Sequence, residues 1–254
     1  MCPERAGTRN RIARGQPEGA LRERSPLVSC RGLIKTYVQG AIEVPALRGV
    51  DLDLARGDFA TLAGPSGSGK TTLLNMIGGL DRPSAGDVVL DGRNLATLGK
   101  AELAELRLHR IGFVFQSYNL IPVLSALENV EFILRLQGIA PRERRQRALE
   151  ALADVGLEGL EGRRPAHLSG GQQQRVAVAR ALVGRPAIVL ADEPTANLDT
   201  RNAEELIELM AALNARLGTT FLMGTHDARV IARAQRHIEL TDGRISSDET
   251  RPAG

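Results

Sequence analysis

The sequence predicts an α/β fold with a mostly parallel core sheet, an antiparallel layer of strands ahead of it and a helical insertion. Three observations carry this prediction. Strand-like and helix-like segments alternate along most of the 254 residues, a glycine-rich turn joins a buried strand to a helix within 61–80, and a helix-rich stretch at about 118–165 interrupts the alternation. A chain of this length can bury one substantial core.

The first predicted elements are short strands. Residues 27–30 are apolar, and residues 50–54 alternate between apolar and polar types, as a half-buried strand does. Residues 61–63 indicate a buried strand, and the helix after it places its apolar residues on one side over 73–80. Another strand is expected at 87–90. The earliest strands form the antiparallel layer.

The middle of the chain changes character after a buried strand at 111–115. The sequence Ser-Ala-Leu-Glu at 125–128 is a capping box, which opens a helix through about Gln137. A highly charged helix is expected at about 141–155. Together these segments make the helical insertion of about 118–165.

Strands and helices alternate again to the end of the chain. A helix begins near Gln172. The remaining predicted strands are 187–191, 219–223 and 237–240, and the predicted helices between them are 206–217 and 227–234.

The positive charge of the chain is concentrated at its start. Residues 1–24 contain six of the 33 basic and three of the 30 acidic residues, which leaves 27 of each in residues 25–254. We expect 1–24 to be a disordered basic tail, with contact to anionic lipid or nucleic acid as the alternative, and 25–254 to be the folded domain. The neutral domain argues against a nucleic-acid partner.

Two further absences limit the class of protein. No apolar run approaches the roughly 18 residues that span a bilayer, and the start of the chain lacks the apolar segment of a secretion signal. Cys2 and Cys30 form no CxxC pair, so neither a zinc site nor a disulfide is expected. We therefore expect a chain in a reducing cytosol that reaches a membrane only through a partner.

A phosphate-binding loop is the strongest local motif. Residues 64–71 match GxxxxGK[ST], between a predicted strand and a predicted helix. Glycines let backbone N–H groups turn toward an anion, and the helix N-terminus attracts the same charge. We expect Lys70 to reach the β- and γ-phosphates and the Thr71 hydroxyl to bind Mg²⁺; the alternative is a glycine-rich turn without a ligand. The residues expected to bind nucleotide here are Gly64, Pro65, Ser66, Gly67, Ser68, Gly69, Lys70, Thr71 and Thr72.

Two adjacent carboxylates follow the apolar run at 187–191. A charge at the mouth of a buried strand is costly unless a cation or a task compensates for it. Asp192 suits Mg²⁺, and Glu193 suits orienting and deprotonating an attacking water. A surface turn at Asp-Glu-Pro is the alternative, which the nearby phosphate loop disfavours.

The sequence Leu-Ser-Gly-Gly-Gln at 168–172 resembles the ABC signature motif, and the resemblance to ABC transporter ATPases covers about 27–246. It implies an ABC-type P-loop NTPase fold that binds and hydrolyses ATP with Mg²⁺. In that family the signature of one copy covers the ATP held by the other, so Ser169, Gly170, Gly171 and Gln172 are expected to bind ATP across a head-to-tail dimer. The second subunit is another copy of this chain or a homologous ATPase.

The same resemblance assigns roles to single residues. Tyr37 matches the aromatic residue that stacks on adenine, and Gln116 matches the glutamine that links γ-phosphate and Mg²⁺ to the helical insertion. Residues 197–199 resemble the loop that contacts the dimer partner. His226 resembles the histidine that contacts γ-phosphate, so Glu193, His226, Gln116 and Lys70 are the expected catalytic residues.

A narrower resemblance concerns the transporter type. The segments 78–81, 115–122 and 125–130 resemble the lipoprotein-releasing and macrolide-exporter group. It implies an integral-membrane permease as partner, export as the direction and a place at the cytoplasmic face of the inner or plasma membrane. The groove near Gln116 and 118–124 is expected to hold a cytoplasmic helix of the permease.

Three other functions are alternatives to a transporter ATPase. A soluble ABC-type ATPase acting on nucleic acid or the ribosome usually carries long coiled coils or two cassettes, which this sequence lacks. A non-catalytic regulatory subunit is disfavoured by the intact Glu193 and His226. A small-molecule kinase with a phosphate loop is excluded by the signature.

Overall fold

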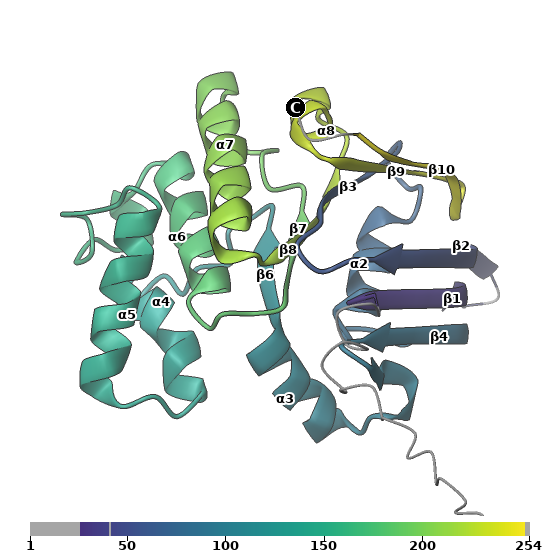
Figure 1. The fold of residues 1–254 in the computed structure, drawn as a ribbon, viewed down its shortest axis with the longest axis horizontal. Helices are drawn as coiled ribbons and strands as arrows, with labels where there is room; N and C mark the ends of the chain where they lie inside the picture. Colours follow the sequence, from purple (N-terminus) through teal and green to yellow (C-terminus); the bar gives the residue numbers. More distant parts are fainter. Residues whose placement is uncertain (1–25, 41, 252–254) are drawn as a thin grey trace, which may run out of the picture.

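The computed structural model describes residues 26–40 and 42–251. The tail predicted at 1–24 lies outside the described residues. Two sheets organise the fold (Figure 1). The larger has the strand order β10-β9-β3-β8-β7-β6, and the smaller has the order β2-β1-β4-β5.

The larger sheet is the predicted parallel core. Its strands are β3 Phe59–Ala63, β6 Ile111–Phe115, β7 Ile188–Asp192, β8 Thr220–Thr225, β9 Arg236–Thr241 and β10 Arg244–Thr250. Pairing is parallel from β9 through β3, β8 and β7 to β6, and only β10 is antiparallel to its neighbour. The carboxyl ends of these five parallel strands therefore meet at one edge, where loops can gather functional groups.

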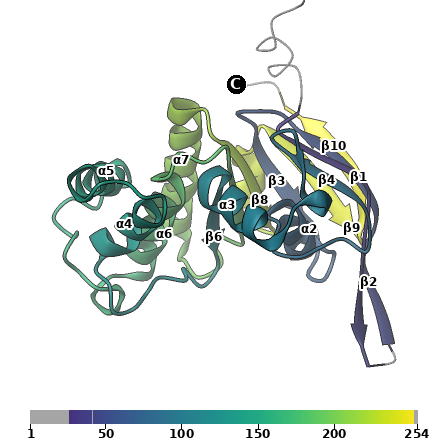
Figure 2. The ribbon, with the colours of Figure 1, turned by 90° about the horizontal axis from the view of Figure 1, so that it is seen from below.

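The smaller sheet is the predicted antiparallel layer, so the fold class is confirmed. Its strands are β1 Val28–Gln39, β2 Ile42–Leu54, β4 Ala85–Leu90 and β5 Arg93–Asn94. The first two are much longer than the predicted strands at 27–30 and 50–54, and Figure 2 shows β2 extending away from the body. The extra length carries mostly exposed side chains, which give no burial pattern to predict from.

Helix α2, Lys70–Ile77, packs between the two sheets and touches β7 and β8 on one side and β2 and β4 on the other. Five of its eight residues are buried, as expected for a helix covered on two faces. The helix α3, Lys100–Arg110, was not predicted; it begins where Glu102 accepts a hydrogen bond from the Gly99 amide at 2.9 Å. It runs directly into β6, which leaves no turn residue to mark its end.

The helical stretch contains α4 Ala126–Leu136 and α5 Pro141–Asp154, which pack on α6 Gly170–Leu182. The capping box at the start of α4 is present: Ser125 Oγ accepts from the Glu128 amide at 3.2 Å, and Glu128 Oε2 accepts from the Ser125 amide at 2.7 Å. After it come α7 Thr200–Leu217 and α8 Ala228–Arg233. No helix among the described residues is long and apolar enough to cross a membrane.

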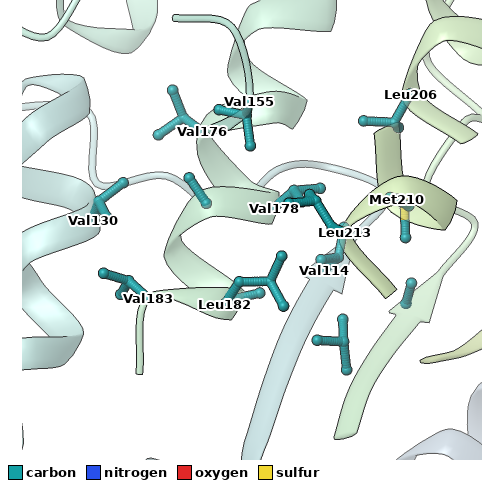
Figure 3. Packing of buried hydrophobic residues seen from close by; sticks show 14 of the residues in the cluster. Val114, Val130, Val155, Val176, Val178, Leu182, Val183, Leu206, Met210 and Leu213 are labelled. Carbon is teal, nitrogen blue, oxygen red and sulfur yellow. The ribbon is translucent and has the colours of Figure 1, made fainter. Parts of the chain in front are cut away.

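The core divides into two apolar clusters. One joins the helices α4 to α7 with one face of the large sheet, and Val178 and Leu182 of α6 lie near its middle in Figure 3. The other fills the space between the two sheets around α2. Val114 of β6 belongs to the first cluster and Ile111 to the second, so β6 lies at the boundary between them.

Candidate active site

The phosphate loop connects β3 to α2 and is shaped by glycines. Gly64, Gly67 and Gly69 have φ values of 147°, 78° and 108°, a region that side chains with a Cβ avoid. A Cβ on Gly64 would lie 2.1 Å from the Leu240 carbonyl oxygen, and one on Gly69 would lie 2.6 Å from that of Ala46. The loop is therefore pressed against β2 and β9, and only glycine fits at these two positions.

Lys70 begins α2, and its ammonium turns back over the loop. Its Nζ donates to the carbonyl oxygens of Gly64 at 2.8 Å and Pro65 at 3.0 Å, and the residue is 8% exposed. An ammonium has three donors, so one remains for an anion in the loop. Ser68 is also buried, and its Oγ has no hydrogen-bond partner among the described residues.

A hollow of about 570 Å³ opens on this loop. Its walls come from the loop, α2, β2 and the segments that follow β6, β7 and β8. They are Ala46, Pro65, Ser66, Gly67, Gly69, Lys70, Thr71, Thr72, Gln116, Glu193, Ala196 and His226. The structure therefore brings together all four residues predicted to be catalytic, from segments far apart in the sequence.

Thr71 lines this hollow, and Asp192 lies next to it, behind the Thr71 hydroxyl. The Thr71 hydroxyl donates to Asp192 Oδ2 at 2.8 Å, while the buried Asp192 Oδ1 has no partner among the described residues. Burial raises the pKa of Asp192 above its ordinary value, and the Thr71 hydrogen bond opposes that shift. The Thr71 hydroxyl and the Asp192 carboxylate, whose Oδ1 accepts no hydrogen bond from the described residues, together suit Mg²⁺. This cation prefers oxygen ligands and takes few of them from the protein.

The described residues offer no alternative cage of protein ligands. None of their His, Cys, Asp and Glu side chains form a group of three placed to hold a metal ion. A cation here would share its ligands with the phosphates of a nucleotide, as Mg²⁺ commonly does.

Glu193 and His226 form the facing wall of the hollow. Glu193 Oε1 lies 2.8 Å from His226 Nδ1; the glutamate side chain is 17% exposed and the histidine side chain 71%. Glu193 has a φ of 48°, and its amide donates to the Gly224 carbonyl at 2.8 Å. In a continuing strand, the adjacent side chains of Asp192 and Glu193 would point to opposite faces of the sheet. The left-handed turn at the end of β7 ends this alternation, so both carboxylates can serve one site.

Gln116 follows β6 and lines the same hollow. Its carbonyl accepts from Asn197 Nδ2 at 2.9 Å, which ties the end of β6 to the loop after Glu193. The Gln116 side chain lines the hollow and makes no hydrogen bond to the other described residues. Its predicted part in holding Mg²⁺ and γ-phosphate stays a prediction.

Tyr37 lies outside the walls of this hollow. Its hydroxyl donates to Asp81 Oδ2 at 3.1 Å, and the Lys35 ammonium lies 4.8 Å from its ring centroid. The side chain is partly exposed on β1, and its role beside adenine stays a prediction. Ala46 of β2 is the wall residue from this layer, and sequence reasoning missed it because an alanine carries no chemical signal.

The signature residues form a second, separate helix start. Ser169 Oγ accepts from the Gln172 amide at 3.3 Å, and Gln172 Oε1 accepts from the Ser169 amide at 2.9 Å. A Cβ on Gly170 would lie 2.9 Å from Tyr118 Oη, and one on Gly171 would lie 2.8 Å from Asn202 Oδ1. None of Ser169, Gly170, Gly171 and Gln172 lines the hollow around Lys70.

Gln174 is a positioning residue that sequence reasoning missed. It is fully buried in α6, and its Nε2 donates to the Pro194 carbonyl at 2.7 Å and the Phe115 carbonyl at 3.4 Å. It therefore joins the signature helix to the residues beside Gln116 and Glu193. Within the run of glutamines at 172–174, the sequence gives no sign that this one points inward.

A second hollow of about 480 Å³ lies along β6. Its walls come from α3, β6, α4, the end of α6 and the segment after Gln116. They are Leu80, Ala104, Arg107, Leu108, Ile111, Gly112, Phe113, Phe115, Asn119, Ile121, Phe132, Ile133, Arg180, Ala181, Gly184 and Pro186. We call it the apolar groove. Phe115 faces the groove, and the next residue, Gln116, faces the hollow of Lys70.

Comparison with known proteins identifies the arrangement. A family model described as ABC transporter matches residues 47–196. Two dimeric structures of MJ0796 are similar over 89% of this chain and all of theirs, each with a TM-score of 0.83. The one described as a post-hydrolysis state of the ATP-binding cassette bound to ADP and Pi is 44% identical, and the one described as a bacterial ABC transporter cassette is 43% identical.

A third solved structure is more distant. It is cbiO1 from Clostridium perfringens, described as part of the ABC transporter complex cbiONQ. It is 28% identical, with 89% of each chain covered and a TM-score of 0.80.

Proposed function

The chain belongs to the ABC transporter family, and from that premise we propose that it is the ATP-hydrolysing subunit of a membrane transporter. It works by head-to-tail closure of two cassettes around ATP. The transporter is of the lipoprotein-release or macrolide-export type, and the chain lies at the cytoplasmic face of the membrane, held there by its permease.

One observation supports the pairing of two cassettes above all others. The signature residues Ser169 to Gln172 begin a helix suited to binding an anion, yet they contribute nothing to the walls of the hollow around Lys70. A second cassette rotated head-to-tail would supply its signature to this hollow and receive the same contact in return. The dimeric MJ0796 cassettes, one of them bound to ADP and Pi, support this arrangement.

Binding of the nucleotide depends on the loop and α2. The backbone amides of 64–69 and the Lys70 ammonium hold the phosphates, which carry the charge of ATP. Thr71, Gln116 and Asp192 would hold Mg²⁺, which neutralises charge on the phosphates when bound. Tyr37 stacks on adenine in this proposal.

Hydrolysis depends on Glu193. Water attacks the γ-phosphorus, the bond to the ADP oxygen breaks, and Glu193 accepts the proton that the water loses. His226 lies within hydrogen-bond distance of Glu193 and holds it in position at the wall of the hollow. Closure of the second cassette excludes other water and brings Ser169 to the γ-phosphate.

The apolar groove supports a mechanical link to the permease, which in this transporter type drives export. The apolar groove begins at Phe115, beside Gln116, so a permease helix in it would sense whether the nucleotide side is closed. Closing and opening of the cassettes then moves that helix. The ATPase determines when movement occurs, and the permease determines what is moved.

The catalytic assignment is tested by Glu193→Gln. We expect nucleotide affinity to be retained while the hydrolysis rate falls by about 10²–10⁴-fold, because a general base is removed. The matched control is Glu158→Gln, which changes an exposed glutamate that makes no side-chain hydrogen bond or ion pair with the other described residues. Hydrolysis by Glu193→Gln at the wild-type rate would contradict the assignment.

The transporter type is tested by purifying the full chain from membranes with its bound partner. A permease with a large extracytoplasmic domain supports the lipoprotein-release or macrolide-export type. A many-helix importer permease contradicts that type but not the role in a transporter. Recovery with ribosomes or nucleic acid and without a membrane protein contradicts the transporter role itself and favours a soluble ABC-type ATPase.

A further inference from the structure

The turn that follows α2 is bound to strand β1 beside Tyr37. The Ser84 amide donates to the Ile34 carbonyl at 2.8 Å, and the Thr36 amide donates to Ser84 Oγ at 3.1 Å. Asp81 lies in the same turn, shortly after the end of α2. Since α2 begins at the phosphate loop, one short helix joins that loop to the segment bound to β1.

Lys35 and Asp81 form an ion pair across this contact. The Lys35 Nζ lies 2.9 Å from Asp81 Oδ1 and 2.8 Å from Oδ2, and it also donates to the Arg82 carbonyl at 2.8 Å. The lysine side chain is 12% exposed. Burial alone would raise the pKa of Asp81, but hydrogen bonds from its neighbours hold that pKa below its ordinary value. Asp81 is therefore a charged carboxylate at neutral pH.

This carboxylate holds the Tyr37 hydroxyl. A charged carboxylate only accepts hydrogen bonds, so Tyr37 is the donor to Asp81 Oδ2 at 3.1 Å. The Lys35 ammonium lies over the Tyr37 ring, 4.8 Å from its centroid, which is within the range of a cation–π contact. Lys35 and Tyr37 are two residues apart on β1, so their side chains share one face of the strand. The ring is thus anchored at its hydroxyl and covered by a cation on one face.

The rest of the Tyr37 side chain remains open toward the proposed nucleotide site. The residue is 36% exposed, and it pairs with Val44 of β2. Val44 is two residues, or about 7 Å of strand, from Ala46, which lines the hollow around Lys70. The pairing of β1 with β2 skips Ala46, which forms a bulge of the kind that re-aims side chains next to a site.

We propose that Lys35 and Asp81 are positioning residues for the base of the nucleotide: they hold the Tyr37 ring so that its uncovered face meets the base. The inference rests on the proposed function, which places adenine at Tyr37, and it adds the two residues that fix the ring. A ring that is fixed before the nucleotide arrives loses little side-chain freedom on stacking. More of the stacking energy then appears as affinity.

Helix α2 sets the distance between the two halves of this site. It is eight residues long, which corresponds to about 12 Å. Lys70 at its start faces the phosphates, and Asp81 beyond its end holds Tyr37. A ligand that has the phosphates but no base reaches only the first half, so its affinity does not depend on Lys35 or Asp81.

The test compares the affinity of the full chain for ATP with its affinity for tripolyphosphate, which carries the phosphates without the base. Calorimetric titration measures both ligands. We expect Tyr37→Ala to weaken ATP binding by about 30-fold, because base stacking is lost. We expect Asp81→Ala and Lys35→Met to weaken it by about 3- to 5-fold, because the ring remains but is no longer fixed. All three variants should bind tripolyphosphate within about twofold of wild type, since the phosphate loop is unchanged.

A second variant separates the role of Asp81 from its part in folding. Tyr37→Phe keeps the ring and removes only the hydroxyl that Asp81 accepts, so it should weaken ATP binding as much as Asp81→Ala does. The two changes together should weaken it little further. Additive losses would overturn the inference, because Asp81 would then act on the nucleotide without Tyr37. If Asp81→Ala does not fold, Tyr37→Phe decides alone, and unchanged ATP affinity overturns the inference.

Lys100→Met is the matched control for Lys35→Met. It changes an exposed lysine that makes no side-chain hydrogen bond or ion pair with the other described residues. Its affinity for both ligands should stay within about twofold of wild type. An equal loss of ATP affinity in Lys100→Met and Lys35→Met would mean that general charge, and not the contact with Tyr37, is responsible, and it would overturn the part of Lys35.

The levels of failure are distinguishable. If the wild-type chain binds neither ATP nor tripolyphosphate, the proposed function fails and this inference with it. If Tyr37→Ala leaves ATP affinity unchanged, the base lies elsewhere, and the stacking role of Tyr37 fails together with this inference. If Tyr37→Ala weakens ATP binding alone, while Asp81→Ala either has no effect or weakens both ligands equally, only this inference fails.

Discussion

The two hollows that adjoin at the end of β6 are similar in size and differ in chemistry. The hollow around Lys70, which we propose holds the nucleotide and call the nucleotide hollow, measures about 570 Å³ and is built from a glycine loop and polar side chains at strand ends. The apolar groove, about 480 Å³, is built from helix and strand side chains around two arginines. The adjacent residues Phe115 and Gln116 face one hollow each. Volume therefore says little about function, and the wall residues determine which ligand each hollow suits.

The comparison also shows where each hollow gets its shape. The nucleotide hollow depends on backbone positions that tolerate only glycine, such as Gly64 and Gly69. The groove depends on the packing of α3, α4 and α6 against β6, which lies where the two core clusters meet. A change on one side should thus leave the other side intact, except at the residues that join them.

The largest expected effect lies on the nucleotide side. Lys70→Ala removes a charged donor from the loop, and loss of such a hydrogen bond costs about 2–3 kcal/mol, so ATP affinity should fall about 100-fold. Calorimetric titration with ATP measures it, with Lys100→Ala as the control at an exposed lysine. Lys70→Ala should leave binding of the permease unaffected. Unchanged ATP affinity would mean that the loop binds no phosphate.

The groove side is disturbed most by Asn129→Ala. Asn129 is fully buried in α4, and its amide bonds with Ile121, Leu124 and Ser125 hold the segment that leads to the groove. Several buried backbone groups lose their partner, so the free energy of unfolding should fall by about 2–3 kcal/mol. Denaturant unfolding measures this, with the exposed Gln146→Ala as control. A loss under about 0.5 kcal/mol, typical of a surface change, would contradict the role.

The link between the hollows is tested by Gln116→Ala. A neutral hydrogen bond is worth about 1 kcal/mol, so kcat should fall about fivefold while ATP affinity stays within about twofold. More tellingly, the permease should no longer change the hydrolysis rate of this variant. The measurement is the steady-state hydrolysis rate of Gln116→Ala with and without permease. If that rate still changes when permease is added, Gln116 does not link the permease to hydrolysis.

The smallest expected effect is a gain in stability. Burial raises the folded-state pKa of Asp192 above its ordinary value. The stability linked to its protonation is therefore fully present below the ordinary pKa and is lost as the pH rises through the raised pKa, so the charged carboxylate opposes folding at neutral pH. Asp192→Asn should raise the melting temperature of the nucleotide-free chain by about 2–4 °C at pH 7. The difference should shrink as the pH falls through the raised pKa, and a lower melting temperature for the variant would refute the account.

The sequence predicts the nucleotide side far better than the groove. The residues 64–71, Asp192, Glu193 and His226 carry chemical signals, and parallel strands place the ends of their segments at one edge. The left-handed turn at Glu193 lets Asp192 and Glu193 reach the same site. The sequence gives no signal for this turn, because no glycine or asparagine marks it.

The groove arises from packing between distant segments, which a single sequence does not reveal. Helix α3 was missed, although Leu103 and Leu106 lie on its buried side, and with it the wall that carries Arg107. Arg180 lies near the end of α6, and the sequence gives no sign that its side chain lines the groove. Gln174 is similar: only the fold shows that its amide joins Phe115 and Pro194.

The pairing of cassettes is tested most directly by the mass of Glu193→Gln in light scattering with MgATP. The variant holds ATP without turning it over, so it should have twice the monomer mass with MgATP and the monomer mass without it. Adding Ser169→Glu, which places a negative charge where the partner's γ-phosphate would lie, should restore the monomer. A Glu193→Gln chain that binds ATP and stays monomeric, or a dimer that survives Ser169→Glu, would contradict closure through the signature.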